Sequence, residues 1–228
     1  MYNRIVICGA RSGSQRVKNK NIKNLGKHKL IEYTLRVARM LSLPVYVSSD
    51  SDEILKAVSD FSDSLVRSTF INIKRPIELA SNISTDLDWI KHLLDEYYIT
   101  KREYPDQLIF LRPTTPFRDA NIVRKAMKKF DSTKYSSLRS VEEMKESIYK
   151  TYSIKNCYLE PFNKELSNLP NQQVPTSYSA NGYVDILVTK QILENNELYG
   201  NSIMPFVTER TMEIDDEFDF KLAKGLMK

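Results

Sequence analysis

A loop near the N-terminus combines small residues with positive charge. The segment GARSGSQRVKNKN (9–21) follows a short apolar run, and seven basic residues and no acid occur between Arg11 and Ile31. Glycine and serine let backbone N–H groups approach the oxygens of an anion closely, and basic side chains supply the opposite charge. The segment fits neither G-x-x-x-x-G-K-S/T nor G-x-G-x-x-G. We interpret it as an anion-binding loop of another kind, and a solvated basic loop is the alternative.

The C-terminal part carries the opposite charge. Six acids between Glu209 and Asp219 are offset only by Arg210, a composition that suits a cation. The net charge of +5 alone would also fit a nucleic-acid-binding module that uses the basic loop. The aromatic residues of the chain form no base-stacking motif, so we expect no nucleic-acid partner.

Size and composition indicate one folded domain. The 228 residues are 41% hydrophobic and 28% charged, which is typical of a globular protein with a core. No run approaches the roughly 20 apolar residues that cross a bilayer. We therefore expect a cytoplasmic protein without a membrane partner. Cys8 and Cys157 lack metal-ligand spacing and are expected to be reduced thiols.

Strand-like and helix-like segments alternate along the chain. Apolar runs predict strands at 3–8, 44–50, 107–111, 135–140, 148–154, 183–188 and 203–207. Helical periodicity and capping residues predict helices at 30–41, 51–61, 84–98, 119–130 and 215–227. The expected caps are Ser51, Asp119 and either Ser84 or Thr85. This order predicts an α/β fold with a mostly parallel sheet, whose ligands gather at the carboxyl ends of the strands.

Five segments resemble one known family. The segments ARSGSQRVKNKNI, RPIELAS (75–81), LRPTTPFR (111–118), NG (181–182) and EIDDEFDF (213–220) resemble, in this order, the acylneuraminate cytidylyltransferases, also called CMP-acylneuraminate synthetases. The resemblance implies a Rossmann-like nucleotidyltransferase fold with helices on both faces of the sheet. It also implies a single domain over 1–228, a homodimer, and a dimerisation or flap insertion at 140–178.

The resemblance further implies that the first loop wraps the triphosphate of CTP. The nucleotide-binding candidates are Ala10, Arg11, Ser14, Arg16, Lys20, Asn21, Arg75, Ser84 and Thr85. The catalytic candidates are Arg11, Lys20 and Asp215. Family members have Lys-Gly where this chain has Gln15–Arg16, and we infer that Arg16 supplies the missing charge. For Ser84 and Thr85, a role as plain helix caps remains an equal interpretation.

The acidic end corresponds to the family's D-I-D motif, whose two carboxylates lie on the same side of a strand and bind Mg²⁺. Glu213 and Asp215 are therefore the metal-ligand candidates, and Glu213 has a longer side chain than the aspartate of the family. The neighbouring acids Asp216, Glu217 and Asp219 are better explained by the dipole of the last helix.

The sugar side matches the family less well. The substrate-binding candidates are Arg112, Arg118, Lys150 and Asn181. Arg112 replaces a glutamine of the LQPTSPLR motif, and a turn arginine paired with a nearby carboxylate is the alternative interpretation. Asn171 and Ser179 replace arginines of the family, and NGYVDI departs from NGAIYI.

The residues and the resemblance together predict a Mg²⁺-dependent cytidylyltransferase. It would transfer CMP from CTP to the anomeric hydroxyl of a sialic-acid-like nonulosonate, in the synthesis of surface glycans. The same reaction on another keto-sugar acid or on a sugar phosphate is the first alternative. A nucleotide-binding regulator without activity is another.

Overall fold

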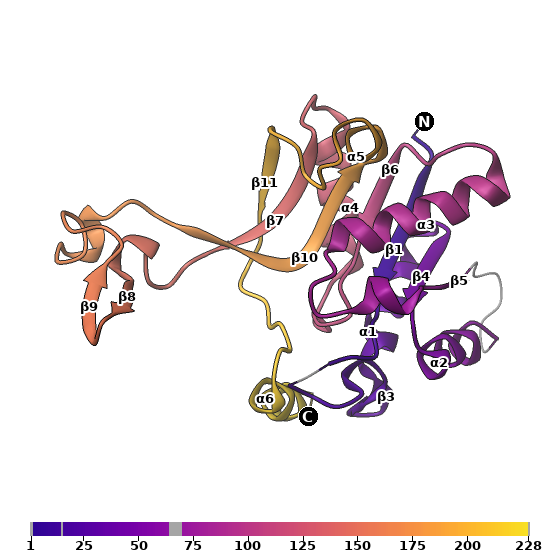
Figure 1. Ribbon diagram of the computed structural model, residues 1–228, viewed down its shortest axis with the longest axis horizontal. Helices are drawn as coiled ribbons and strands as arrows, with labels where there is room; N and C mark the ends of the chain where they lie inside the picture. Colours follow the sequence, from indigo (N-terminus) through magenta and orange to yellow (C-terminus); the bar gives the residue numbers. More distant parts are fainter. Residues whose placement is uncertain (1, 15, 64–69, 228) are drawn as a thin grey trace.

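A seven-stranded sheet forms the centre of the computed structural model, which describes residues 2–14, 16–63 and 70–227. Gln15 lies outside the described residues. The strand order is β11-β7-β10-β6-β1-β4-β5 (Figure 1). The strands are Arg4–Gly9 (β1), Val45–Ser49 (β4), Phe70–Lys74 (β5), Gln107–Phe110 (β6), Ser137–Glu143 (β7), Tyr178–Val188 (β10) and Ile203–Val207 (β11). Only β10 runs antiparallel to its neighbours in this sheet, which confirms the predicted mostly parallel sheet.

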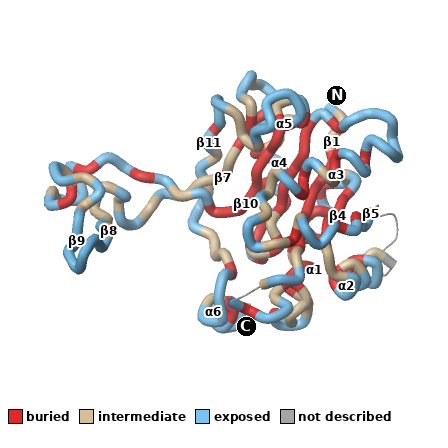
Figure 2. The backbone as a smooth tube through the Cα atoms, in the orientation of Figure 1, coloured by how far each residue is buried: buried red, intermediate tan, exposed pale blue. Residues whose placement is uncertain are grey.

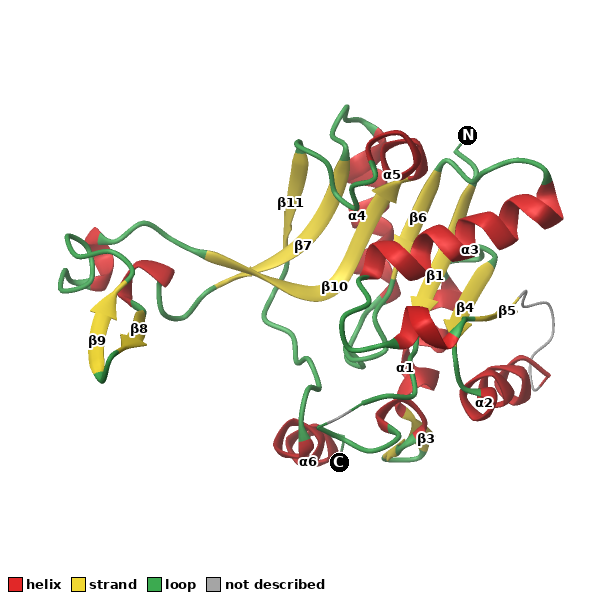
Figure 3. Cartoon of the chain, viewed as in Figure 1, coloured by secondary structure: helices red, strands yellow, loops and turns green. Residues whose placement is uncertain are grey.

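Helices cover both faces of the sheet (Figure 3). They are Leu30–Met40 (α1), Asp52–Asp63 (α2), Asp86–Lys101 (α3), Ala120–Asp131 (α4) and Thr189–Asn195 (α5). A sixth helix, Glu217–Leu226 (α6), packs in a separate small core away from the sheet. Alternate side chains of β1 enter two separate cores, because successive residues of a strand point to opposite faces. Val6 packs with α1, α2 and α4, whereas Ile7 packs with α3 and α5. Figure 2 shows the buried backbone concentrated in these central strands.

Side-chain caps fix where the helices around the site begin. The Thr85 hydroxyl accepts from the backbone N–H of Asp88, and the Asp88 carboxylate accepts from the backbone N–H of Thr85. Asp119 caps α4, and the Ser51 hydroxyl accepts from Ile54 at the start of α2. The predicted caps are confirmed, with Thr85 rather than Ser84 at the start of α3.

The segment between β7 and β10 projects away from the sheet (Figure 1). Its far end contains a small antiparallel hairpin, Tyr152–Lys155 (β8) and Tyr158–Pro161 (β9). The strand predicted at 148–154 therefore begins late, because Ile148–Lys150 forms a 3₁₀ turn instead. We call residues 144–177 the arm. It lies within the range where the resemblance implied an insertion.

Four strands and one helix escaped the sequence analysis, and β9 of the arm is one of them. Asn24–Leu25 (β2) and His28–Lys29 (β3) form a hairpin of two residues a side. The edge strand β5 and helix α5 were not predicted either. β5 alternates only weakly and α5 spans seven residues, so neither presents a long periodic pattern.

Among the described residues, no helix is both long and apolar enough to cross a membrane.

Arg118 joins the loop after β6 to β10 and does not reach a ligand. The residue is 7% exposed, and its guanidinium donates to the carbonyls of Tyr183, Gly182 and Arg112 and to the Thr34 hydroxyl, at 2.5, 3.0, 2.9 and 3.1 Å. Burial lowers the pKa of Arg118 to about 10. The prediction that Arg118 contacts the sugar is wrong for this structure, because its donors already satisfy buried protein oxygens.

Replacing Arg118 by methionine leaves these buried carbonyls without donors, so we expect Arg118→Met to lower the free energy of unfolding by about 3 kcal/mol. Urea denaturation measures the change. Lys125→Met, on the exposed side of α4, is the matched control and should change it by less than about 0.5 kcal/mol. Equal stability of the two variants would contradict the structural role of Arg118.

Candidate functional site

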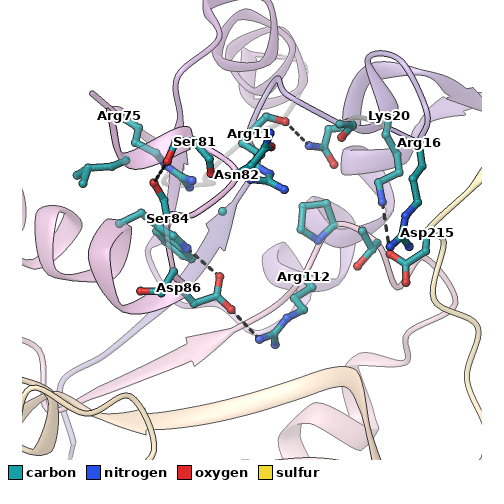
Figure 4. A pocket seen from close by; sticks show the side chains of 18 of the residues that line it. Arg11, Arg16, Lys20, Arg75, Ser81, Asn82, Ser84, Asp86, Arg112 and Asp215 are labelled. Carbon is teal, nitrogen blue, oxygen red and sulfur yellow. Dashed lines mark hydrogen bonds and ion pairs between the residues drawn. The ribbon is translucent and has the colours of Figure 1, made fainter. Parts of the chain in front are cut away.

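A cavity of about 640 Å³ lies at the carboxyl ends of β1 and β6 (Figure 4). This is the position at which an open α/β sheet binds its ligands. Most of the residues that the sequence singled out line the cavity, and they come from both ends of the chain. They are Arg11, Ser14, Arg16, Lys20, Asn21, Arg75, Ser84, Thr85, Arg112, Glu213 and Asp215.

Hydrogen bonds fix the conformation of the first loop. Ala10 is buried, and its N–H donates to the carbonyl of Ser48 at 2.9 Å. The amide of Asn21 donates to the carbonyl of Arg11 at 3.0 Å, and the Arg11 guanidinium donates to the carbonyl of Ser81 at 2.8 Å. Ala10 and Asn21 thus shape the loop, while the Arg11 side chain crosses the cavity.

A carboxylate that the sequence analysis did not single out also supports this loop. Asp50 follows β4 and accepts from the backbone N–H of Ser12 at 2.9 Å, and the Ser12 hydroxyl donates to it as well. These hydrogen bonds hold the pKa of Asp50 below its usual range, against the opposing effect of burial. Its position at the carboxyl end of a parallel strand was the available signal.

Basic side chains are concentrated on the loop side of the cavity. Lys20 donates to the carbonyl of Ile214 at 2.8 Å and lies 3.7 Å from the Asp215 carboxylate. Burial lowers the pKa of Lys20, while the charges of Asp215 and Glu213 oppose the change. Arg16 lies on the same side (Figure 4) and has no hydrogen-bond or ion-pair partner within the described ranges. This side of the cavity therefore offers cations to a ligand.

The acidic segment is a loop and not the predicted strand. β11 ends at Val207, and the backbone N–H of Ile214 donates to the carbonyl of Thr114 at 2.8 Å instead of entering a sheet. Ile214 is fully buried, whereas Glu213 and Asp215 on either side of it line the cavity. Glu213 and Asp215 therefore face the same cavity, as predicted, although they do not belong to a strand. The Thr114 hydroxyl donates to Glu213 at 2.9 Å.

The acids that follow belong to the start of α6. Asp216 is the N-cap, and with Asp219 it forms a capping box. Glu217 lies in the first turn and pairs with Lys23 at 2.6 Å. The helix-dipole interpretation of these three acids is confirmed. In the part of the chain that the structure describes, no group of three or more acids, histidines and cysteines could hold a metal on its own.

Arg75 and Trp89 form the wall on the side of β4. The Arg75 guanidinium donates to the hydroxyl and the carbonyl of Ser48 at 3.1 and 3.0 Å and lies 4.8 Å from the centre of the Trp89 ring. Burial lowers the pKa of Arg75 to about 10. A Cβ atom on Gly9 would lie 2.7 Å from the Trp89 ring, so glycine is needed there to leave room for this ring. Trp89 is buried and also lines the cavity.

Arg112 forms ion pairs with two carboxylates that the sequence analysis did not single out. Its guanidinium lies 2.6 Å from Asp185 and 2.9 Å from Asp86. The alternative interpretation, a turn arginine paired with a carboxylate, is the one that the structure supports. Ser84 and Thr85 sit beside Asp86, with their hydroxyls bonded to the Glu78 carbonyl and to Asp88.

Besides Arg118, two further predicted substrate residues do not line the cavity. Lys150 lies on the arm, where it donates to the carbonyl of Leu169 at 2.9 Å and to the side chain of Asn171 at 2.7 Å. The amide of Asn181 donates to the Thr208 hydroxyl at 2.7 Å and is buried. Within one chain, Lys150 is not brought to the cavity, because the arm leads it away from the sheet. Asn181 is in β10, next to Gly182, which lies beside Arg112 and Glu213 of the cavity.

Known sequences support the resemblance to cytidylyltransferases. A family model described as cytidylyltransferase matches residues 5–86. The N-acylneuraminate cytidylyltransferase of Escherichia coli is 27% identical over 96% of this chain, which spans 51% of that protein. The CMP-N,N'-diacetyllegionaminic acid synthase of Legionella pneumophila is 24% identical, over 98% of this chain and 96% of that protein. The chain thus spans about half of one relative and nearly all of the other.

Solved structures agree with the fold. A CMP:2-keto-3-deoxy-manno-octonic acid synthetase complexed with CTP has a TM-score of 0.71 at 13% identity, with 98% of each chain covered. The 4-diphosphocytidyl-2C-methyl-D-erythritol synthase of Anaerococcus prevotii has a TM-score of 0.63 at 12% identity, with 98% and 97% covered. These likenesses confirm the Rossmann-like fold. Together, the family model and the relatives show that the chain is similar to cytidylyltransferases, and they support its resemblance to the acylneuraminate cytidylyltransferases.

Proposed function

We propose that this chain transfers CMP from CTP to the anomeric hydroxyl of an acidic sugar, a sialic-acid-like nonulosonate, and releases pyrophosphate. The observation that carries the proposal is one cavity that joins the cations of the first loop to the carboxylates of residues 213 and 215. The names of its relatives, which refer to acylneuraminate and to legionaminic acid, support the sugar class.

The basic side chains of the first loop are suited to bind the triphosphate of CTP. Arg11, Arg16 and Lys20 line the cavity and can contact its oxygens. When the sugar hydroxyl attacks in line, its oxygen forms a bond to the α-phosphorus and the bond to the β-phosphate oxygen breaks. The hydroxyl proton leaves to solvent, and the negative charge at the α-phosphate increases. Positioned cations and N–H groups stabilise that charge, which lowers the barrier.

Glu213 and Asp215 fit the Mg²⁺ that the family implies. Mg²⁺ is typically held by one or two carboxylates, substrate phosphates and water, so a group of three protein ligands is not needed. Both carboxylates line the cavity, and the Asp215 side chain is 56% exposed. Bound there, Mg²⁺ would neutralise charge on the phosphates of CTP. Lys20 holds the Ile214 carbonyl, and it thereby fixes the backbone between the two ligands.

The acceptor is the finer part of the proposal. Asn171 and Ser179 replace two arginines of the family, so this chain lacks two of the cations that help bind a nine-carbon keto-acid there. The second candidate function is therefore the same reaction on a different keto-sugar acid or on a sugar phosphate.

Pyrophosphate release from CTP with a panel of acceptors tests the function. We expect Mg²⁺-dependent turnover with at least one of acylneuraminate, legionaminic acid and pseudaminic acid. Asp215→Asn should lower kcat by about 100-fold or more, because the loss of one oriented charge at such a site has that magnitude.

Glu217→Gln is the matched control for Asp215→Asn, because it removes an acid two residues away that does not line the cavity. It should leave kcat unchanged. Turnover only with other keto-sugar acids or sugar phosphates would select the second candidate. Absence of turnover with every acceptor would refute both candidates.

The lowered pKa of Lys20 predicts how CTP binding depends on pH. Triphosphate binding needs the protonated amine, and burial makes Lys20 lose its proton at a lower pH than an ordinary lysine. CTP affinity should therefore fall by about tenfold per pH unit once the pH exceeds that lowered pKa. Isothermal titration calorimetry from about pH 7 to about pH 10 measures it. Lys20→Arg should shift the fall to higher pH, and an identical profile for both proteins would contradict the role of Lys20.

We further propose that the arm joins two chains into a homodimer. Its hairpin exposes large apolar side chains: Ile154 and Leu159 are directly opposite on β8 and β9 and are 80% and 69% exposed. A paired, exposed apolar face of this kind is typical of an interface. A partner arm would also bring Lys150 to another chain.

The cytoplasmic location of the protein stays a prediction.

Ile154→Asp with Leu159→Asp places two carboxylates on this face and should convert a dimer into a monomer, as measured by light scattering. Ser153→Asp is the matched control, because Ser153 pairs with Glu160 on the other face of the hairpin. A wild-type protein that is monomeric at every concentration would refute the proposed dimer.

A further inference from the structure

A continuous row of contacts crosses the cavity wall from β10 to β4. The Asp185 carboxylate accepts from the Arg112 guanidinium at 2.6 Å, and Arg112 also donates to Asp86 at 2.9 Å. The other oxygen of Asp86 accepts from the indole N–H of Trp89 at 2.9 Å. Trp89 in turn lies under the Arg75 guanidinium. Asp86 and Trp89 both belong to the first turn of α3, so the row links β10, the loop after β6, α3 and the residue after β5.

Arg112 has no charge to spare for a ligand. Asp185 is 1% exposed in β10, and a carboxylate at that depth requires a cation partner. The Tyr199 hydroxyl donates to the same oxygen of Asp185 at 2.9 Å, and Arg139 reaches its other oxygen only at 4.0 Å. One terminal nitrogen of Arg112 supplies the close ion pair that neutralises Asp185, and its other terminal nitrogen donates to Asp86.

The surroundings hold the guanidinium in place. Arg112 lies 4.2 Å from the centre of the Phe110 ring, whose edge meets Trp89 with ring centres 5.4 Å apart. Burial alone would lower the pKa of Arg112, but the charges of Asp185 and Asp86 raise it above its ordinary value. The two ion pairs and the ring contact fix the guanidinium plane, and with it the orientation of Asp86.

We propose that Arg112 is a positioning residue, which locks Asp86 onto Trp89 and so fixes the nucleotide wall of the cavity, and that it does not bind the carboxylate of the acidic sugar. The proposal rests on the proposed function for the identity of the two substrates. Its geometric part, the dependence of Asp86 and Trp89 on Arg112, stands without it.

The arrangement also indicates which substrate groups this wall accepts. Both residues line the cavity, but the Asp86 side chain is 39% exposed and that of Arg112 only 20%, so the carboxylate is the more accessible of the two groups. A carboxylate oxygen that accepts one hydrogen bond can accept another. The wall therefore takes a hydroxyl or an N–H group of the substrate and repels a carboxylate.

Trp89 gives a direct readout, because it is the single tryptophan of the chain. Arg112→Gln should shift its fluorescence emission to longer wavelength, since Asp86 is released and water reaches the indole. CTP should bind about tenfold more weakly, which corresponds to about 1.4 kcal/mol. Arg112→Lys keeps the charge but not the two-pronged geometry, so it should not rescue CTP binding. The KM of the acceptor should change much less than that of CTP.

The same measurements are made in an Asp185→Asn background, which removes the buried charge that could prevent Arg112→Gln from folding. Asp86→Asn combined with Arg112→Gln should bind CTP within roughly twofold of the weaker single variant, because both act through one contact. Arg139→Gln is the matched control: it removes a cation near Asp185 that does not touch Asp86, and should leave the Trp89 emission unchanged.

The proposal is overturned if Arg112→Gln raises the acceptor KM while CTP binding and Trp89 emission stay as in the wild type, or if Arg112→Lys restores that KM. Additive effects of Asp86→Asn and Arg112→Gln on CTP binding would also overturn it. A failure of the proposed function looks different: no acceptor is turned over, but Arg112→Gln still shifts the Trp89 emission.

Discussion

The packing of the last helix against the first loop is the contact on which the site depends. Ile214 and Phe220 share a small apolar core with Val17 and Leu25, apart from the two cores that flank the sheet. Burying side chains of this size contributes about 1.5–3 kcal/mol each. This core brings the basic and acidic ends of the chain together, so Lys20 lies 3.7 Å from Asp215. Without it, the loop would have cations and no carboxylates beside them.

Hydrogen bonding divides the basic residues of the site into two kinds. Arg16 has no hydrogen-bond or ion-pair partner among the described residues, and Lys20 has only the Ile214 carbonyl and the Asp215 carboxylate, so both keep donors for an anion. Arg75, Arg112 and Arg118 are bonded to backbone carbonyls, hydroxyls or carboxylates of the protein. Their guanidinium groups shape the wall of the cavity. The residue type alone therefore does not tell whether an arginine is free to bind an anion or shapes the wall of the cavity.

The sequence predicted what depends on local patterns and missed what depends on distant partners. The central strands and the caps Ser51, Thr85 and Asp119 follow from apolar runs and from short-range hydrogen bonds. The burial of Arg118 could not be predicted, because its carbonyl partners lie more than 60 residues away on β10. The loop structure around Glu213 was missed for a similar reason: the backbone N–H of Ile214 donates to the carbonyl of Thr114, which is far away in the sequence.

A crystal structure of the chain with CTP and Mg²⁺ tests the central claim most directly. We predict that the triphosphate lies between the first loop and residues 213–215, with Lys20 or Arg16 on its oxygens and the metal on Asp215. Trp89 and Asp86 should keep their contact and form the wall beside the nucleoside. CTP bound elsewhere, or bound in this cavity with Asp215 directed away from the phosphates and the metal, would contradict the account.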